Sequence, residues 1–225
     1  MPTLSPILKN KMITTKEINK VFSLLEPLHQ PTMLEQLKEY TPFQLLVATL
    51  LSARTKDTTI IPLVKRLFQK YPQPRDLAKA DIKALEQELF QSGFYKVKAR
   101  HVKELSRIVH EQYHDLIPTD FVQLTALPGV GRKTANCILN YAFHQPAIAV
   151  DTHVHRISNR LGWVKTETPE ETEEALQKIV PRELWSKINM LLVDHGQRIC
   201  LPRKPQCGIC PVRKECEYGK RISEK

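Results

Sequence analysis

The chain has 225 residues and a formal net charge of +10 at pH 7, from 34 lysines and arginines against 24 aspartates and glutamates. This excess of positive charge favours a polyanionic partner, and the length allows a substantial buried core. No apolar run approaches the roughly 20 residues that a membrane-spanning helix needs, and residues 1–12 lack the apolar stretch and cleavage site of a secretory signal. We therefore expect a cytoplasmic protein with no membrane partner.

Apolar residues recur at helical spacing along the chain and alternating strand patterns are scarce, so the sequence predicts an all-α fold. The first predicted helix, residues 15–25, carries its apolar side chains on one face. The segment 43–54 is apolar nearly all round, which is typical of a buried central helix. Further helices are predicted from 57 or 58 through 68, from 81 to 93, over 95–113, 119–126 and 132–143, from 169 onwards, and over 181–197.

Local residue types predict some details of these helices. Asp57 or Thr58 is expected to cap the helix that follows 43–54. Pro62 is placed early enough in that helix for its missing N–H to be tolerated. In the helix over 95–113, Val97 is placed on the inward face.

A glycine-rich turn, LPGVGRKTA at residues 127–135, joins two of the predicted helices. Gly129 and Gly131 are expected to supply positive φ for a tight connection, and Arg132 and Lys133 lie in the first turn of the helix that follows. A hairpin of this kind presents backbone N–H groups and a helix N-terminus, which bind phosphate oxygens without reading a base. On its own the pattern is also that of a simple helix corner.

Four of the five cysteines lie in one C-terminal segment with C-x6-C-x2-C-x5-C spacing. They are Cys200, Cys207, Cys210 and Cys216. Four thiolates in a short loop hold either a [4Fe–4S] cluster or a structural zinc ion, and a metal site rather than disulfides fits a reducing compartment. The fifth, Cys137, is expected to be a small core residue.

Together with VDTHVHRISNRLG at residues 150–162, the glycine-rich string resembles the signatures of the endonuclease III family of helix-hairpin-helix DNA glycosylases. The resemblance covers essentially the whole chain. It implies two helical lobes, a six-helix barrel with the helix-hairpin-helix over 35–145 and a second lobe from 1–34 and 146–225. The cysteine spacing matches the family's iron–sulfur pattern, so the resemblance implies a [4Fe–4S] cluster in the loop 200–216, with zinc as the alternative.

The resemblance also assigns chemistry to Lys133 and Asp151, on opposite walls of a DNA groove between the lobes. A lysine amine that attacks C1′ of a deoxyribose gives a Schiff base, which permits β-elimination of the 3′ phosphate. Because an unperturbed lysine is protonated at neutral pH, desolvation or proton transfer to a carboxylate must supply the free amine. Taken singly, Lys133 is equally a phosphate contact and Asp151 a helix N-cap. His153 is expected to line the groove, and Asp57 to organise the loop near the hairpin.

Two loops resemble the family's insertion loops, which fill the gap left by an extruded base. In the loop 51–57, Arg54 stands where better-known members carry glutamine, which affects the expected opposite-base preference. In the loop 92–99, Phe94 is the apolar wedge, its alternative being a buried residue at a helix junction. Arg203 and Lys204 in the cysteine loop are expected to contact DNA. The basic residues of the helix after the second loop are phosphate contacts or a solvated face: Lys96, Lys98, Arg100 and Lys103.

The resemblance implies a bifunctional DNA N-glycosylase and abasic-site lyase that removes oxidised pyrimidines in base excision repair. Its expected partner is double-stranded DNA with damaged bases or abasic sites, bound by a monomer located with the DNA (the nucleoid in a bacterium). One alternative is a glycosylase of the same scaffold directed at mismatched or UV-damaged pyrimidines. Another is a non-catalytic DNA-binding protein, against which the pairing of Lys133 with Asp151 argues. A zinc-dependent regulator would be colourless, whereas an iron–sulfur protein is yellow-brown.

Overall fold

The structure is a computed structural model that describes residues 13–223, and within them every regular element is a helix. The predicted absence of a secretory signal in residues 1–12 concerns a segment outside the described residues. The α-helices are α1 (Thr15–Leu25), α2 (Met33–Gln36), α3 (Pro42–Ser52), α4 (Asp57–Lys70), α5 (Pro74–Lys79), α6 (Ile82–Glu88), α7 (Tyr95–Tyr113), α8 (Phe121–Thr125), α9 (Arg132–Tyr141), α10 (Thr152–Leu161), α11 (Pro169–Ile179), α12 (Trp185–Arg198) and α13 (Glu217–Ser223). Short 3-10 turns cover Glu26–Leu28, Arg182–Leu184 and Arg213–Glu215.

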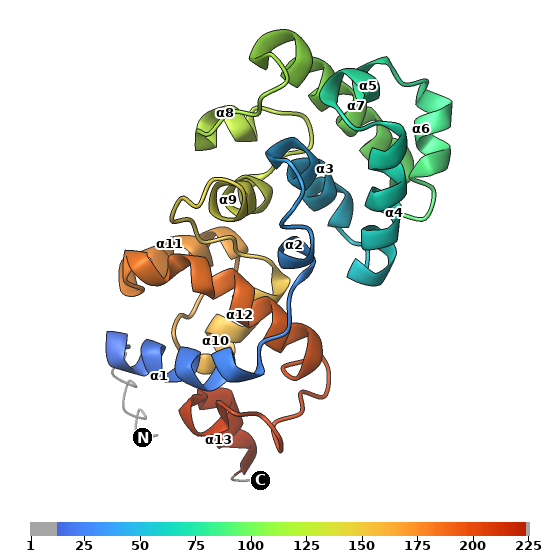
Figure 1. Ribbon diagram of the computed structural model, residues 1–225. Helices are drawn as coiled ribbons and strands as arrows, with labels where there is room; N and C mark the ends of the chain where they lie inside the picture. The colour runs from blue at the N-terminus through green and yellow to red at the C-terminus, as the bar shows by residue number, and fades with distance from the viewer. Residues whose placement is uncertain (1–12, 224–225) are drawn as a thin grey trace, which may run out of the picture.

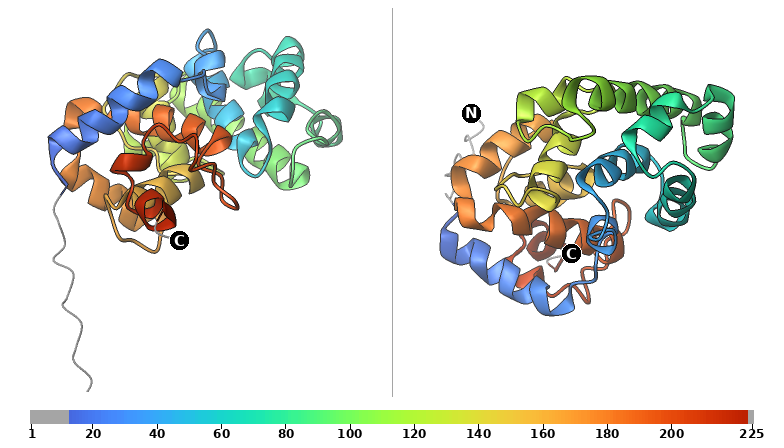
Figure 2. Two further views of the ribbon diagram at one scale, coloured as in Figure 1. Left: turned by 90° about the horizontal axis from the view of Figure 1, so that it is seen from below. Right: turned by 45° about the horizontal axis from the view of Figure 1, so that its top comes forward.

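The helices form two lobes, each around its own cluster of buried side chains (Figure 1). Helices α3 to α9 enclose the first cluster. The second joins α1 to α10, α11 and α12, so the N-terminal helix lies beside the C-terminal ones in both further views (Figure 2). The predicted all-α, two-lobed fold is confirmed. Among the described helices, none is long and apolar enough to cross a bilayer.

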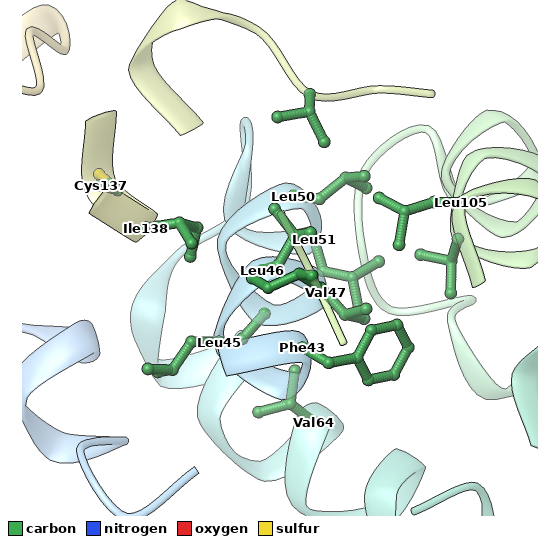
Figure 3. Close-up of a cluster of buried hydrophobic side chains, with 14 of the residues drawn as sticks. Phe43, Leu45, Leu46, Val47, Leu50, Leu51, Val64, Leu105, Cys137 and Ile138 are labelled. Carbon is green, nitrogen blue, oxygen red and sulfur yellow. The ribbon is translucent and has the colours of Figure 1, made fainter. Parts of the chain in front are cut away.

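Helix α3 is the centre of the first lobe, as its apolar sequence predicts. Leu46 and Leu51 are completely buried, and side chains from three other helices surround α3, among them Val64, Leu105 and Ile138 (Figure 3). Full burial of one such side chain contributes about 1.5–3 kcal/mol. The buried α3 therefore fixes where the loop after it and the start of α9 lie.

Helix α4 begins differently from the prediction. Its N-cap is Lys56, whose side chain makes no capping hydrogen bond, so the prediction of Asp57 or Thr58 as the cap is wrong. The Asp57 carboxylate accepts a hydrogen bond from Nε2 of Gln197, at 3.0 Å. Pro62 lies inside the helix, past its first turn, where its missing N–H removes one backbone hydrogen bond.

Other differences concern short elements and helix ends. Helices α2 and α5 have four and six residues, too few for an apolar period to be recognised. The helix predicted over 81–93 ends at Glu88, and the one predicted over 181–197 begins at Trp185, after a 3-10 turn. Val97 is 47% exposed rather than inward.

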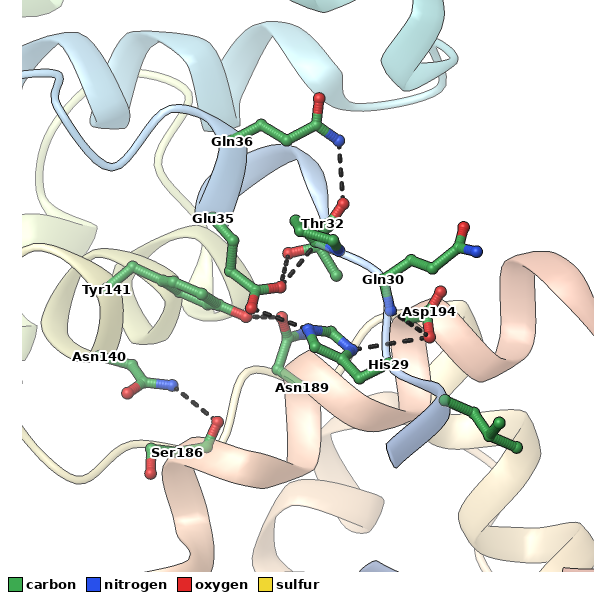
Figure 4. Close-up of polar contacts among 12 residues, drawn as sticks. His29, Gln30, Thr32, Glu35, Gln36, Asn140, Tyr141, Ser186, Asn189 and Asp194 are labelled. Atoms are coloured by element: carbon green, nitrogen blue, oxygen red, sulfur yellow. Dashed lines mark hydrogen bonds and ion pairs between the residues drawn. The ribbon is translucent and has the colours of Figure 1, made fainter. Parts of the chain in front are cut away.

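A polar network joins the lobes beside the segment between α1 and α2 (Figure 4). His29 Nε2 lies 2.8 Å from a Glu35 oxygen, and its Nδ1 lies 3.6 Å from Asp194. Tyr141 on α9 donates a hydrogen bond to Asn189 on α12, at 3.2 Å. Because α9 belongs to the first lobe and α12 to the second, these contacts hold the lobes together.

Candidate active site and metal centre

The turn between α8 and α9 uses its two glycines differently. Gly129 has a φ of 77°, and a Cβ there would lie 2.7 Å from Nδ1 of His101 and 2.9 Å from Cδ1 of Leu50. Gly131, the N-cap of α9, has an extended backbone with a φ of −93°. The predicted positive φ is therefore confirmed at Gly129 and wrong at Gly131. A Cβ at Gly131 would meet nothing within 4 Å, so the backbone there lies open to an approaching phosphate.

Lys133 lies half-buried in the first turn of α9. Burial acts to lower the pKa of this lysine, whereas Cys137, Asp151 and Asp57 act to raise it, and the net pKa lies above the ordinary value. In the DNA-free protein Lys133 is therefore an ammonium. Desolvation alone does not free the amine, so proton transfer is the remaining route of the two expected from the sequence.

Cys137 lies one helical turn after Lys133 and is completely buried, which confirms the predicted core residue. Its thiol acts on the pKa of Lys133, an interaction that the sequence analysis missed although the i, i+4 spacing signals it. Burial raises the pKa of the Cys137 thiol above its ordinary value. Asp151 and Asp57 are the two carboxylates that act to raise the pKa of Lys133.

Asp151 is the N-cap of α10. Its Oδ1 accepts hydrogen bonds from the backbone N–H groups of His153 and Val154, each at 2.8 Å. The N-cap interpretation is therefore confirmed, and it coexists with an electrostatic interaction with Lys133. Since α9 packs in the first core and α10 in the second, Lys133 and Asp151 approach each other where the two lobes adjoin.

The two predicted insertion loops lie side by side. Arg54 and Phe94 both have left-handed backbones, with φ values of 55° and 61°. The Arg54 guanidinium carbon lies 5.3 Å from the centre of the Phe94 ring. Phe94 is 61% exposed, so its alternative interpretation as a buried junction residue is wrong.

Two other predicted DNA-contact residues have protein partners. Nη2 of Arg132 forms an ion pair at 2.7 Å with Glu173 on α11, whose side chain is 5% exposed. The Arg132 guanidinium also lies over the ring of Phe121, at 5.1 Å. His153 Nδ1 lies 3.1 Å from Nη2 of Arg156. Arg132 therefore joins the lobes, and a phosphate contact by it would compete with Glu173.

The four predicted ligand cysteines line one cavity between α10, α12 and α13, together with side chains such as Ile157, His195 and Tyr218. Within residues 13–223, no three thiol, imidazole or carboxylate groups are placed to share one metal ion. The four thiols that line this cavity are the donor set of a [4Fe–4S] cluster, which is held by four cysteine thiolates. Burial raises the pKa of Cys210 to about 11, and bound metal is what makes such a thiol a thiolate.

Helix α10 also holds the cysteine loop in place. Nη1 of Arg160 donates a hydrogen bond to Sγ of Cys200, at 3.3 Å, and another to the Leu201 carbonyl, at 2.7 Å. The helix that begins at Asp151 is thereby connected at its other end to the metal centre. Arg203 and Lys204 are exposed between the first two ligands, as a phosphate contact requires.

The fold, the hairpin and the cysteine cavity define a class of DNA-repair protein. Residues 47–182 match the HhH-GPD superfamily of base excision DNA repair proteins, and residues 200–216 match the iron-sulfur binding domain of endonuclease III. Endonuclease III of Thermotoga maritima is 50% identical over 184 residues, which cover 82% of this chain and 86% of the relative. The chain belongs to the endonuclease III family.

Solved structures of the family share the whole fold. A non-covalent endonuclease III–DNA complex matches with a TM-score of 0.86 and 37% identity, over 95% of this chain and 100% of that one. A trapped endonuclease III–DNA covalent intermediate, in an estranged-adenine complex, matches with a TM-score of 0.82 and 36% identity, over 94% and 100%. This chain is thus a bifunctional DNA glycosylase and abasic-site lyase of base excision repair, and its cysteine loop holds a [4Fe–4S] cluster.

Proposed function

We propose that this chain removes oxidised pyrimidines from double-stranded DNA, with Lys133 as the nucleophile and Asp151 as the carboxylate that takes its proton. The observation that carries the proposal is the approach of Lys133 on α9 to Asp151 on α10, close enough for the charge of Asp151 to raise the pKa of Lys133. A phosphate-binding lysine needs no carboxylate beside it, because the carboxylate would repel the phosphate.

Proton transfer comes first in the proposed reaction, because Lys133 is an ammonium. Two N–H groups occupy Oδ1 of Asp151, so we assign Oδ2 as the acceptor. The freed Nζ then attacks C1′ while the bond from C1′ to the base breaks, and the base leaves with the bonding electrons and takes the proton that Asp151 received from Lys133. Loss of that proton makes Asp151 a carboxylate again, which stabilises the positive charge of the adduct.

The lyase step follows on the same lysine. Transfer of a proton from Nζ of the adduct to the ring oxygen opens the sugar ring and leaves a protonated Schiff base between C1′ and Nζ of Lys133. Water takes a proton from C2′, and the electrons of that bond expel the 3′ phosphate by β-elimination. Water then hydrolyses the Schiff base, which leaves an aldehyde on the released sugar and returns Lys133 as an ammonium, its form at the start of the cycle.

We assign the DNA contacts by position and charge. The hairpin receives a phosphate of the damaged strand at the open backbone of Gly131, which the tight turn at Gly129 presents. Arg203 and Lys204 receive another phosphate beyond the cluster. His153 lines the groove. Arg132 is assigned as a DNA contact because it directly follows the hairpin.

Arg54 and Phe94 fill the space of the extruded base. Their exposure and their contact with each other support this role. Arginine at position 54 donates hydrogen bonds only, which favours an orphaned base that presents acceptors. The [4Fe–4S] cluster fixes the basic loop and needs no redox step in this scheme.

We further propose that 35–145 is one domain and that 1–34 with 146–225 is the other. In support, most of the first buried cluster lies within 35–145, with Met33, Leu34, Ala147 and Ala149 just outside, and the second lies within 1–34 and 146–225. One groove serves one lesion, so the active form is a monomer. A DNA-repair enzyme with this charge acts where the DNA is, in the cytoplasm and, in a bacterium, at the nucleoid.

Borohydride trapping tests the assignment of Lys133. Reduction of the Schiff base on a duplex with one abasic site leaves a covalent protein–DNA adduct. We expect the unchanged chain and Lys165→Ala, an exposed control, to trap, and Lys133→Ala to give no adduct while retaining DNA binding. Trapping by Lys133→Ala at the unchanged rate would make Lys133 a phosphate contact. Duplexes with an oxidised, mismatched or UV-damaged pyrimidine then identify the base.

A further inference from the structure

Lys98 is the fourth residue of α7. The sequence predicts it as a phosphate contact or as part of a solvated face, and the structure shows neither. It is 6% exposed, so it is not part of a solvated face and is not placed to contact a phosphate. Its Nζ donates hydrogen bonds to the carbonyl oxygens of Leu51 and Ala53, at 2.8 and 2.7 Å, and to Oγ1 of Thr55, at 3.0 Å. All three acceptors lie in the insertion loop that carries Arg54.

These three hydrogen bonds explain how Lys98 can be buried although none of its partners is charged. An ammonium group has three N–H donors, and here each has an oxygen acceptor. The carbonyls of Leu51 and Ala53 stand at the C-terminal end of α3, where helix carbonyls lack partners and the helix dipole favours positive charge. Burial still acts against the charge and lowers the pKa of Lys98 to about 8. A costly buried group of this kind is retained where it holds a particular geometry.

The same contacts reach the second insertion loop. Thr55 Oγ1 accepts a hydrogen bond from Lys98 and another from the backbone N–H of Gly93, at 3.2 Å. A Cβ at Gly93 would lie 3.2 Å from the Arg54 carbonyl oxygen, so the two backbones are in close contact. Gly93 directly precedes Phe94, and Lys98 follows it by one helical turn.

Thus the buried contacts hold the residues on either side of Arg54 and the residue directly before Phe94. Both Arg54 and Phe94 have left-handed backbones, which are unfavourable and persist only where their surroundings hold them. We propose that Lys98 is a positioning residue that locks the two insertion loops together, so that Arg54 and Phe94 enter the duplex as one wedge. This inference rests on the proposed function, because it concerns how the damaged nucleotide is extruded.

The reason for a locked wedge is physical. Separating a base from its stack costs free energy, which the inserted side chains must offset. Side chains on loops that move independently would lose conformational entropy at that moment, in addition to the cost of unstacking. A wedge ordered before DNA binding avoids this loss, and Lys98 orders it from beneath without touching DNA.

The test compares Lys98→Met, which keeps the length of the side chain and removes its donors, with Lys165→Met. Lys165 is exposed and lies outside both insertion loops, so its substitution removes an equal charge without touching the loops. Thr55→Val, which removes the shared acceptor, is a milder second variant in case Lys98→Met folds poorly. Each variant keeps its iron–sulfur absorbance as a check on the fold.

Two readouts separate positioning from general damage. The fluorescence of 2-aminopurine placed opposite an abasic site rises as the wedge separates it from its neighbours. Borohydride trapping is measured on the duplex and on a single-stranded abasic oligonucleotide, where there is no stack to open. We expect Lys98→Met to lose the fluorescence rise and to lower the ratio of duplex to single-strand trapping by roughly tenfold or more. Thr55→Val changes both in the same direction, and Lys165→Met changes neither.

Equal loss of trapping on both substrates by Lys98→Met and Thr55→Val would overturn the inference, since it would mean damage to the active site as a whole. An unchanged ratio and fluorescence would also overturn it. Failure of the unchanged chain to trap on either substrate would instead contradict the proposed function of Lys133. The two failures are therefore distinguishable.

Discussion

Asp151 combines two roles in one side chain. Its Oδ1 caps α10 through the N–H groups of His153 and Val154, and its negative charge acts on Lys133. Capping requires an oxygen acceptor, whereas proton transfer requires a carboxylate. Because asparagine caps a helix about as well as aspartate, substitutions at this one position can separate the two roles.

We expect Asp151→Asn to keep the stability of the protein and Asp151→Ala to lower the free energy of unfolding by about 0.5–2 kcal/mol, through loss of the cap. Both variants should lose most of their glycosylase activity, since neither can accept the proton of Lys133. Urea unfolding and single-turnover base release measure the two effects. Full activity in Asp151→Asn would mean that Asp151 caps α10 and does not accept the proton of Lys133.

The pH dependence of trapping tests the proton transfer itself. The pKa of Lys133 is raised, so a lysine that loses its proton to water becomes more reactive by about tenfold per pH unit below its pKa. If the proton of Lys133 instead moves to Asp151, the site exchanges no proton with the solvent. The trapping rate then does not change with pH near neutrality. We expect a flat profile for the unchanged chain and a rising one for Asp151→Asn. A rising profile for both would contradict Asp151 as the acceptor.

At the scale of elements, the hairpin between α8 and α9 is held by packing on one side and open on the other. Gly129 faces the protein, where His101 and Leu50 leave no room for a side chain, and Gly131 faces open space. The sequence pattern predicts the same conformation for Gly129 and Gly131. Their different surroundings come from α3 and α7, which approach the hairpin only in the folded chain.

The matched substitutions Gly129→Ala and Gly131→Ala should therefore differ. A Cβ at Gly129 must accept a positive φ and displace its neighbours, so we expect a loss of about 1–3 kcal/mol in unfolding free energy. Gly131→Ala should cost under about 1 kcal/mol and weaken DNA binding instead. Thermal unfolding and titration with an abasic duplex measure these changes. Equal destabilisation by both variants would contradict the assignment of the faces.

At the scale of the whole molecule, the active site depends on how the lobes are joined, since Lys133 and Asp151 come from different cores. The ion pair of Arg132 with Glu173 lies beside Lys133 on α9 and crosses to α11. The positive charge of Arg132 compensates the negative charge of Glu173, whose carboxylate is nearly buried. Arg132 thereby has a structural function that its place in a DNA-binding motif does not reveal.

We expect Arg132→Met to lower the free energy of unfolding by roughly 1–2 kcal/mol, because Glu173 is left without its partner, and a half-exposed arginine limits the loss. Adding Glu173→Met should restore most of the stability, as both charges are then gone. Equilibrium unfolding of the two single variants and the double variant measures the coupling. No recovery in the double variant would contradict the ion pair as the cause. The affinity of the double variant for DNA reports any phosphate contact by Arg132.

The sequence predicted most helices because their apolar periods extend over ten residues or more, as in α1 and α7. It missed α2 and α5, which are too short to show a period. It placed Lys98 on a surface because a lysine among other basic residues is normally solvated. The burial of Lys98 depends on the end of α3, 47 residues earlier, and a local pattern contains no information about that distance.

By itself, the sequence determined the all-α class, the cysteine spacing of the cluster and the strings that contain Lys133 and Asp151, since each of these is a local pattern of residue types. Tertiary structure alone decided which glycine is strained, that Lys133 is held as an ammonium, and that Arg54 and Phe94 lie together over a buried lysine. These properties arise from contacts between segments far apart in the chain. Charge and burial are set by all the neighbours in space, and folding is what brings those neighbours together.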